Sequence, residues 1–360
     1  MNLSIYLDDL QRRIRPDDEN RLTDSWLSFA DCKPSEGFFA PSRSMSPSAI
    51  SWPDININDC IDSIDLMIYQ QLKTVSDTLA SGAGELLSIR PNYGTGIIPS
   101  MYGAEIFVMP AETNTLPGAR PLPGAMNAVK NILEKQEMDF SKKLAGKVFN
   151  FAERWLEVSR PYAEVSRYVR MYNPDLQGPL PLVELLWGSG VYLDIFDESE
   201  TVNAALDFFT YVIIAFLKKF HALCPPFDAE HSIEWGLLHR GKIIIRNDAA
   251  MNISGNMYKE FVMPRDQQII NIFGGGIHFC GKGDHYIGHI SDIEGLSTFN
   301  MSQPEYNDME IIYQNTIDKG IVIIGMPEFE VKRAVAAGRN LRGRVHCGAS
   351  IAAWAEKQPN

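Results

Sequence analysis

The sequence has few of the features that mark membrane, secreted or nucleic-acid-binding proteins. Its longest apolar run, YVIIAFL at 211–217, is far shorter than the ~20 residues that cross a bilayer. The first residues, MNLSIYLDDLQRRIRP, contain no continuous apolar stretch of the signal-peptide kind. Lys and Arg number 33 against 45 Asp and Glu, and a net charge of −12 disfavours phosphate backbones and anionic lipids, whose binding needs clustered basic residues. We therefore expect a cytoplasmic protein with no nucleic-acid or membrane partner.

Cysteine is also scarce, and its pattern argues against a disulfide framework. The five cysteines are an odd number, lie far apart in the sequence and accompany no secretory signal. The remaining composition, 45% hydrophobic and 22% charged, is that of an ordinary globular protein. At 360 residues the chain is long enough for a large single core, including that of an α/β barrel.

The first part of the chain differs in pattern from the rest. Residues 1–75 are expected to form an N-terminal helical extension, with helices near 4–13 and 59–79 and an irregular segment rich in Pro and Ser between them. The sequence leaves open whether this segment, 33–55, forms a lid over a site. It also leaves open whether the chain forms a homo-oligomer.

From residue 76 to 360, short β-like runs alternate with helical patterns, of which 201–223 is the clearest. Strands separated by helices of ten or more residues pair in parallel, and eight such strands indicate a TIM (β/α)8 barrel. A doubly wound open sheet is the alternative, but no Gly-x-Gly-x-x-Gly fingerprint follows an early strand. The expected strands are 86–90, 105–109, 165–171, 242–246, 276–280, 296–299, 320–324 and 343–346.

Polar residues gather where these strands end, which is the face that carries the active site in parallel barrels. Asp248 directly follows the run IIIRN and is the candidate catalytic residue. Each such residue has an alternative role as a turn former or helix cap. The candidate substrate-binding residues at the strand ends are Arg90, Asn92, Tyr93, Gln177, Asn252 and Asn300.

The stretch GGGIHFCGKGDH, at 274–285, indicates a metal site. Residues i and i+2 of a strand point to the same side, so His278 and Cys280 project together and present the nitrogen and sulfur ligands that zinc prefers. Cys347, at the end of another expected strand, is the candidate third ligand, which leaves a fourth position open as in catalytic zinc sites. In the alternative interpretation, His278 is a satisfied strand-end histidine and both cysteines are small buried hydrophobes.

Four blocks of sequence resemble the uroporphyrinogen decarboxylase superfamily of TIM barrels over roughly residues 80–355. They are IRPNYGTGIIPSMYGAE, DLQGPL followed by a long helix, IIIRNDAAMNISGNMYKEFVMP and IHFCG. The superfamily includes tetrapyrrole decarboxylases and zinc-dependent methyltransferases that act on methylated corrinoid proteins. The resemblance implies the barrel fold.

The resemblance also implies a metal and a partner. In the methyltransferase branch, a His-x-Cys pair and a distant Cys-Gly bind zinc, a pattern that His278, Cys280 and Cys347-Gly348 match. The arginine-rich signature of the decarboxylases, Met-Arg-Gln-Ala-Gly-Arg, is absent. We therefore expect Zn²⁺-dependent methyl transfer between a methylated corrinoid protein and a small thiol or similar acceptor. The alternatives are a cofactor-free decarboxylase (a lyase) acting on an acidic tetrapyrrole or another carboxylate, and a non-catalytic corrinoid-binding protein.

Overall fold

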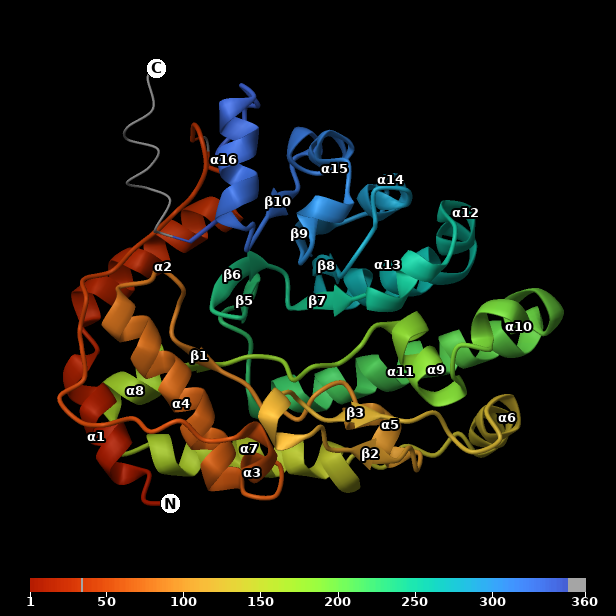
Figure 1. The fold of residues 1–360 in the computed structure, drawn as a ribbon, viewed down its shortest axis with the longest axis horizontal. Helices are drawn as coiled ribbons and strands as arrows, with labels where there is room; N and C mark the ends of the chain where they lie inside the picture. The colour runs from red at the N-terminus through yellow and green to blue at the C-terminus, as the bar shows by residue number, and fades with distance from the viewer. Residues whose placement is uncertain (34, 349–360) are drawn as a thin grey trace.

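The computed structural model describes residues 1–33 and 35–348, so the end of the expected barrel, 349–360, lies outside the described residues. Helices surround parallel strands in a mixed α/β fold (Figure 1). The helices are α1 (Ser4–Arg13), α2 (Pro16–Ala30), α3 (Ile57–Cys60), α4 (Ile64–Ser81), α5 (Ile97–Met101), α6 (Met126–Lys135), α7 (Lys143–Ser159), α8 (Ala163–Tyr168), α9 (Pro179–Trp187), α10 (Val191–Asp197), α11 (Ser199–Leu223), α12 (Gly255–Met257), α13 (Met263–Phe273), α14 (Ile287–Ser291), α15 (Met309–Asn315) and α16 (Glu328–Ala336). The strands are β1 (Ser88–Ile89), β2 (Ile106–Phe107), β3 (Gly118–Ala119), β4 (Arg170–Met171), β5 (His231–Glu234), β6 (Leu237–Arg240), β7 (Ile243–Arg246), β8 (Gly275–Phe279), β9 (Leu296–Met301) and β10 (Val322–Ile323).

The expected parallel pairing is confirmed. Strands β10, β9, β8 and β7 form one parallel sheet in that order, and β1 pairs in parallel with β4. Single parallel bridges extend this set at both ends, from Gln177 to Arg246 beside β7 and from Ile323 to Val345 beside β10. The carboxyl ends of these strands therefore lie at the same edge of the sheet.

Register divides the strand residues between two environments. On the outer face, apolar residues such as Ile245, Ile277 and Phe299 pair in register and join the main hydrophobic core. On the inner face, Arg246 pairs with His278, and His278 pairs with Asn300. Because cross-strand partners point to the same side, the carboxyl ends of these strands carry an inner row of polar side chains.

A β-hairpin that the sequence did not lead us to expect supports this inner row. Strands β5 and β6 pair antiparallel, with Glu234 opposite Leu237, and the hairpin lies between α2 and strands β7–β10 (Figure 1). Trp235 and Gly236 form its two-residue turn, and both have positive φ, 54° and 79°, as a type I′ turn requires.

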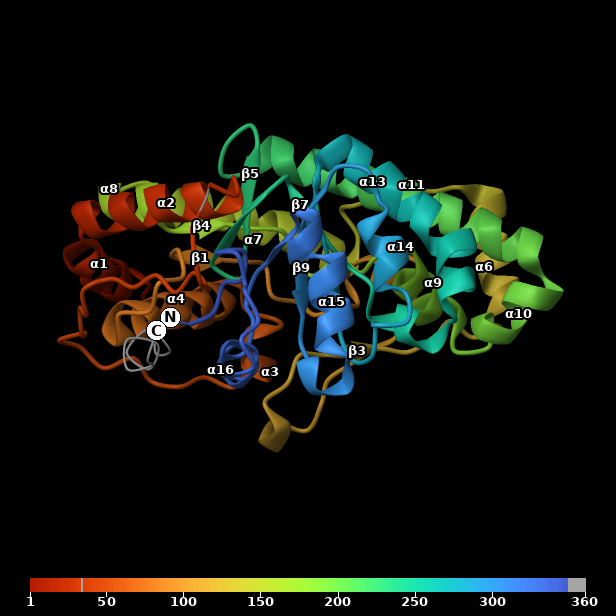
Figure 2. The same cartoon turned by 90° about the horizontal axis from the view of Figure 1, so that it is seen from above.

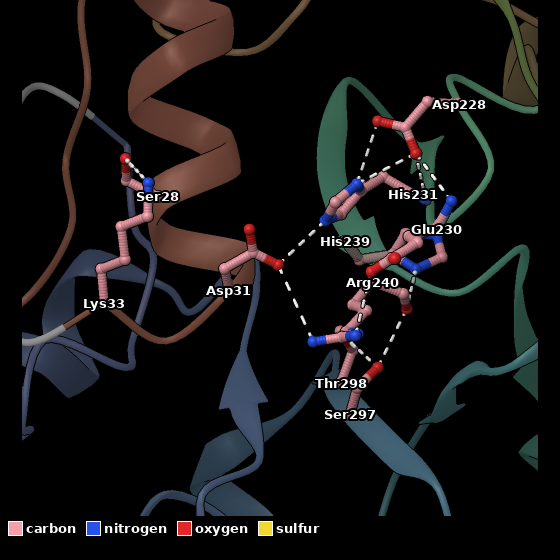
Figure 3. Close-up of polar contacts among 10 residues, drawn as sticks. All are labelled: Ser28, Asp31, Lys33, Asp228, Glu230, His231, His239, Arg240, Ser297 and Thr298. Carbon is pink, nitrogen blue, oxygen red and sulfur yellow. Dashed lines mark hydrogen bonds and ion pairs between the residues drawn. The ribbon is translucent and has the colours of Figure 1, made fainter.

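Hydrogen bonds and ion pairs fix the base of the hairpin (Figure 3). His231 Nδ1 lies 3.0 Å from Asp228 Oδ2, and its Nε2 lies 3.1 Å from Asp31 Oδ1, just beyond the end of α2. Arg240 lies 2.9 Å from Glu230 and 3.9 Å from the same Asp31 oxygen. These contacts join the end of α2 to the base of the hairpin.

The N-terminal helices pack against the strands and the hairpin. Helices α1, α2 and α8 lie on one side of the strands, with α6, α9 and α10 at the far side (Figures 1 and 2). From α2, Leu22 and Trp26 join a second hydrophobic cluster with Leu238 of the hairpin and with Ile244 and Val322 of the inner strand face. The hairpin and α2 thus cover this face of the parallel strands.

Several sequence predictions of local structure were wrong. Most of 165–171 is helix α8, and only its end forms β4. The expected strand at 105–109 contains β2, which pairs antiparallel with β3 outside the parallel set.

The helix expected at 201–223 is confirmed as α11, which is long and apolar enough to cross a membrane, yet 56% of its most apolar window is buried inside the protein.

Replacing Gly236 with Ala tests the hairpin turn. A Cβ there would lie 2.8 Å from Glu85 Cβ and 2.9 Å from Leu86 O, in addition to the strain of φ +79°. Gly338→Ala is the matched control, since Gly338 has φ +74° and nothing within 4 Å of the added Cβ. We expect the control substitution to lower the free energy of unfolding by about 1–2 kcal/mol and Gly236→Ala to lower it by at least about 1 kcal/mol more. Urea unfolding measures both decreases. Equal losses would contradict the tight packing of the turn.

Candidate metal centre

A cavity of about 490 Å³ opens at the carboxyl ends of the inner strand row. Its lining combines strand-end side chains with the hairpin tip, where Trp235 lies. This volume is in the range of sites for small ligands. The sequence-predicted residues that line it are Gln177, Asp248, His278, Cys280 and Asn300.

Three potential metal ligands converge in this cavity. Asp248, His278 and Cys280 each offer one ligand atom, and these atoms lie within 4.8 Å of one another. His278 Nε2 is 3.3 Å from both Cys280 Sγ and Asp248 Oδ1. Donor atoms bound to one tetrahedral zinc ion at 2.0–2.3 Å lie about 3.3–3.8 Å apart. The group can therefore hold a metal ion.

The orientation of His278 is fixed from behind by Asn300. The Asn300 side-chain amide donates to Ile324 O at 2.6 Å, so its oxygen faces His278 Nδ1, also at 2.6 Å. Nδ1 must then carry a proton, which leaves Nε2 as the nitrogen that turns toward Asp248 and Cys280. A hydrogen bond of this kind is the usual support of a metal-binding histidine.

Asp248 and His278 influence each other's ionisation. Burial lowers the pKa of His278, but hydrogen bonds and charge from Asp248 and Cys280 outweigh burial and raise it to about 9. Burial likewise raises the pKa of Asp248, yet the contacts with His278 and the backbone N–H of Cys280 bring it below its ordinary value. Without a metal, the site thus holds an imidazolium beside a carboxylate, and a bound metal must displace the proton on Nε2.

Cys347 is not a member of this group, contrary to the expectation that it would be the third ligand. It does not line the cavity, is fully buried, and donates its backbone N–H to Phe39 O. Burial raises the pKa of its thiol to about 12. The neighbouring His346 points to the inner side, where its ring lies 4.6 Å from that of Trp26. Because adjacent residues in an extended segment point to opposite sides, Cys347 faces the outer core.

Other residues predicted from sequence lie outside the cavity. Arg90 donates to Asn92 and lies 3.5 Å from Asp175, so it contributes behind the lining rather than in it. Tyr93 is fully buried in the core, and burial raises its pKa. Asn252 is exposed and donates to Tyr192.

Among the cavity residues that the sequence analysis missed, Arg246 and Trp235 are those with the clearest chemical role. Arg246 ends strand β7 and pairs in register with His278, so a charged residue closing the apolar run III was the available signal. Trp235 lies in the hairpin turn, and its ring is 5.5 Å from that of His278 and 5.0 Å from the Arg246 guanidinium. Trp235 lies outside the four blocks of sequence that carry the resemblance, whereas Arg246 lies inside the block that begins IIIRN.

A buried carboxylate lies behind Asp248. Asp266 is fully buried and accepts hydrogen bonds from Tyr258 at 2.7 Å and from the side chain of Asn247 at 2.6 Å. Asn247 in turn donates its backbone N–H to His278 O. Burial raises the pKa of Asp266 to about 7, although the two hydrogen bonds oppose the increase. This cluster fixes the turn from which Asp248 enters the cavity.

Comparisons with known proteins do not assign the chain to a family. No protein-family model matches it, and none of the curated proteins does.

Asp266→Asn tests the buried carboxylate through the pH dependence of stability. The pKa of Asp266 is raised to about 7 in the folded protein, so between pH ~4 and ~7 the unfolded chain loses the proton first and stability falls as pH rises. Asn cannot ionise, so the unfolding free energy of the variant should increase relative to that of the wild type by about 1.4 kcal/mol per pH unit across this window. Above the window the difference should stay constant. Urea unfolding at pH 4–8 measures the difference. A difference that stays constant with pH would contradict the buried, titrating Asp266.

Proposed function

We propose that this chain is a zinc-dependent methyltransferase of the uroporphyrinogen decarboxylase superfamily, which transfers a methyl group between a methylated corrinoid protein and a small acceptor such as a thiol. The observation that carries the proposal is the convergence of Asp248, His278 and Cys280 within 4.8 Å. The blocks of sequence that resemble the superfamily supply the reaction class. The proposal replaces Cys347 by Asp248 as the third ligand.

The donor atoms favour zinc among the common metals. One imidazole nitrogen, one sulfur and one carboxylate oxygen form a set that zinc accepts, whereas Mg²⁺ and Ca²⁺ prefer oxygen ligands alone. Three protein ligands leave a fourth position, and the cavity gives a small substrate access to it. A bound zinc ion supplies Lewis acidity that favours the thiolate form of a coordinating acceptor thiol near neutral pH.

The proposal includes a closed (β/α)8 barrel. Support comes from the single bridges that extend the parallel pairs beyond the sheet, between Gln177 and Arg246 and between Ile323 and Val345. A further parallel bridge joins His346 to Phe39, and an antiparallel bridge joins Ser42 to Ala83, shortly before β1. These pairings lead from β10 around toward β1, the direction in which a barrel closes.

The side chains of this chain have separable roles in the proposal. Asn300 keeps the proton of His278 on Nδ1, and Ser302 Oγ lies 3.4 Å from Cys280 Sγ, where it can hold the sulfur in place. Asp248 accepts the backbone N–H of Cys280 at 3.0 Å, which ties the turn after β7 to the turn after β8. The charged and apolar walls of the cavity then position the acceptor.

The charge of the cavity argues against the decarboxylase alternative with an acidic tetrapyrrole. Among the residues that line it, Asp175 and Asp248 oppose the charges of Arg246 and His278, and lysine is absent. A substrate with many carboxylates needs an excess of positive charge. Release of carbon dioxide from such a tetrapyrrole, abolished by Asp248→Ala but not by Cys280→Ser, would favour the lyase. Tight corrinoid binding without any turnover would favour the non-catalytic binding protein.

Zinc content tests the proposed ligand set. In protein purified without chelator we expect one zinc ion per chain, and each of Asp248→Asn, His278→Gln and Cys280→Ser should weaken zinc binding at least about tenfold, because each removes one of three ligands. Cys347→Ser is the matched control and should retain wild-type zinc. Elemental analysis and competition with a chromophoric chelator measure content and affinity.

The control also separates the two ligand sets. Loss of zinc in Cys347→Ser with retention in Asp248→Asn would restore the ligand set predicted from sequence and overturn the one proposed from geometry. Equal, negligible zinc in the wild type and in Cys280→Ser would contradict the metal site altogether.

A further inference from the structure

The strongest unexplained feature of the cavity is the guanidinium of Arg246. Its Nε lies 3.3 Å from Asp175 Oδ1, and its Nη2 lies 2.9 Å from Glu234 Oε2. Its Nη1 is buried and has no hydrogen-bond partner, while the side chain as a whole is only 3% exposed. An unmet buried donor costs about 1–3 kcal/mol, more for a charged group, so the protein has a reason to provide an acceptor there.

The charged groups around Arg246 are balanced in number. Asp175 is shared with Arg90, at 3.5 Å, so two arginines face the two carboxylates of Asp175 and Glu234. Burial raises the pKa of Glu234, although the charge of Arg246 opposes the increase. An anion that approaches Arg246 therefore faces no net negative charge from these four groups.

Trp235 covers the guanidinium from the hairpin tip. Its ring lies 5.0 Å from the guanidinium carbon and, unlike Nη1, is partly exposed in the cavity. An indole face attracts a cation but offers no lone pair in the plane of Nη1. A ligand that reaches the guanidinium must come close to this ring, so the ring should report on occupancy.

We propose that Arg246 and Trp235 form a carboxylate-binding subsite, and that the substrate of this cavity is a short monocarboxylate. The inference deepens the proposed function and takes from it only the role of the cavity. Arg246 and His278 are register partners on adjacent strands, which lie about 4.8 Å apart. A carboxylate held by Arg246 therefore places an atom only a few bonds away beside Asp248, His278 and Cys280.

Butyrate and its neutral isostere butyramide test the subsite, with chelator-treated protein so that zinc plays no part. We expect calorimetry to show butyrate binding at least tenfold tighter than butyramide, and tryptophan fluorescence to change with the same saturation. Arg246→Gln should abolish the preference. Arg90→Gln is the matched control, since Arg90 belongs to the same charge network but does not line the cavity, and it should keep the preference within about threefold.

The remaining arms keep the test decisive if Arg246→Gln fails to fold. Trp235→Phe should retain butyrate binding but lose the fluorescence change. This result would show that, of the six tryptophans of the chain, Trp235 is the one beside the bound anion. Equal affinities for butyrate and butyramide in the wild type, or a fluorescence change that persists in Trp235→Phe, would overturn the subsite. Tighter binding of butanesulfonate or butyl phosphate than of butyrate would overturn its assignment to a carboxylate. Zinc binding is measured separately, so failure of this subsite and failure of the metal site are distinguishable.

Discussion

The hydrogen bond between His278 Nδ1 and the side-chain oxygen of Asn300 is the contact on which the site depends. It is possible because β8 and β9 pair in parallel with these two residues in register. It forces the other ring nitrogen toward Asp248 and Cys280, which enter from the turns after β7 and β8. A shift of one residue in this pairing would turn His278 toward the outer core, and His278 would no longer lie beside Asp248 and Cys280.

The hairpin explains how the buried charge of Arg246 is stabilised inside an α/β fold. Burying Arg246 costs desolvation energy that only close opposite charges can offset. Glu234, at the end of β5, supplies one such charge, and the contacts of His231 with Asp31 and Asp228 hold the hairpin that carries it. The same insertion gives the cavity its aromatic wall. The β5–β6 hairpin thus contributes to the hydrophobic core and also provides the charge and the aromatic ring that surround Arg246.

The sequence predicted features that follow from local periodicity and missed those that follow from packing. Strand alternation put His278 and Cys280 on one side correctly, and the parallel α/β arrangement followed from strands that alternate with helices. Alternation also predicts that Cys347 and His346 point to opposite sides of their segment. Nothing in the local sequence indicates which of the two points to the side of the cavity. The Trp235–Gly236 turn carries a weak hairpin signal, and Arg246 resembled the polar end of a buried strand. Barrel closure, zinc and methyl transfer remain predictions.

X-ray absorption fine structure at the zinc edge of the wild-type protein tests the central claim most directly, because it counts the sulfur atoms bound to the metal. The geometry of Asp248, His278 and Cys280 predicts one sulfur at about 2.3 Å together with nitrogen and oxygen ligands near 2.0–2.2 Å. Two sulfur ligands would show that Cys347 reaches the metal and that the inner row is arranged differently. A zinc spectrum without sulfur would contradict the site itself.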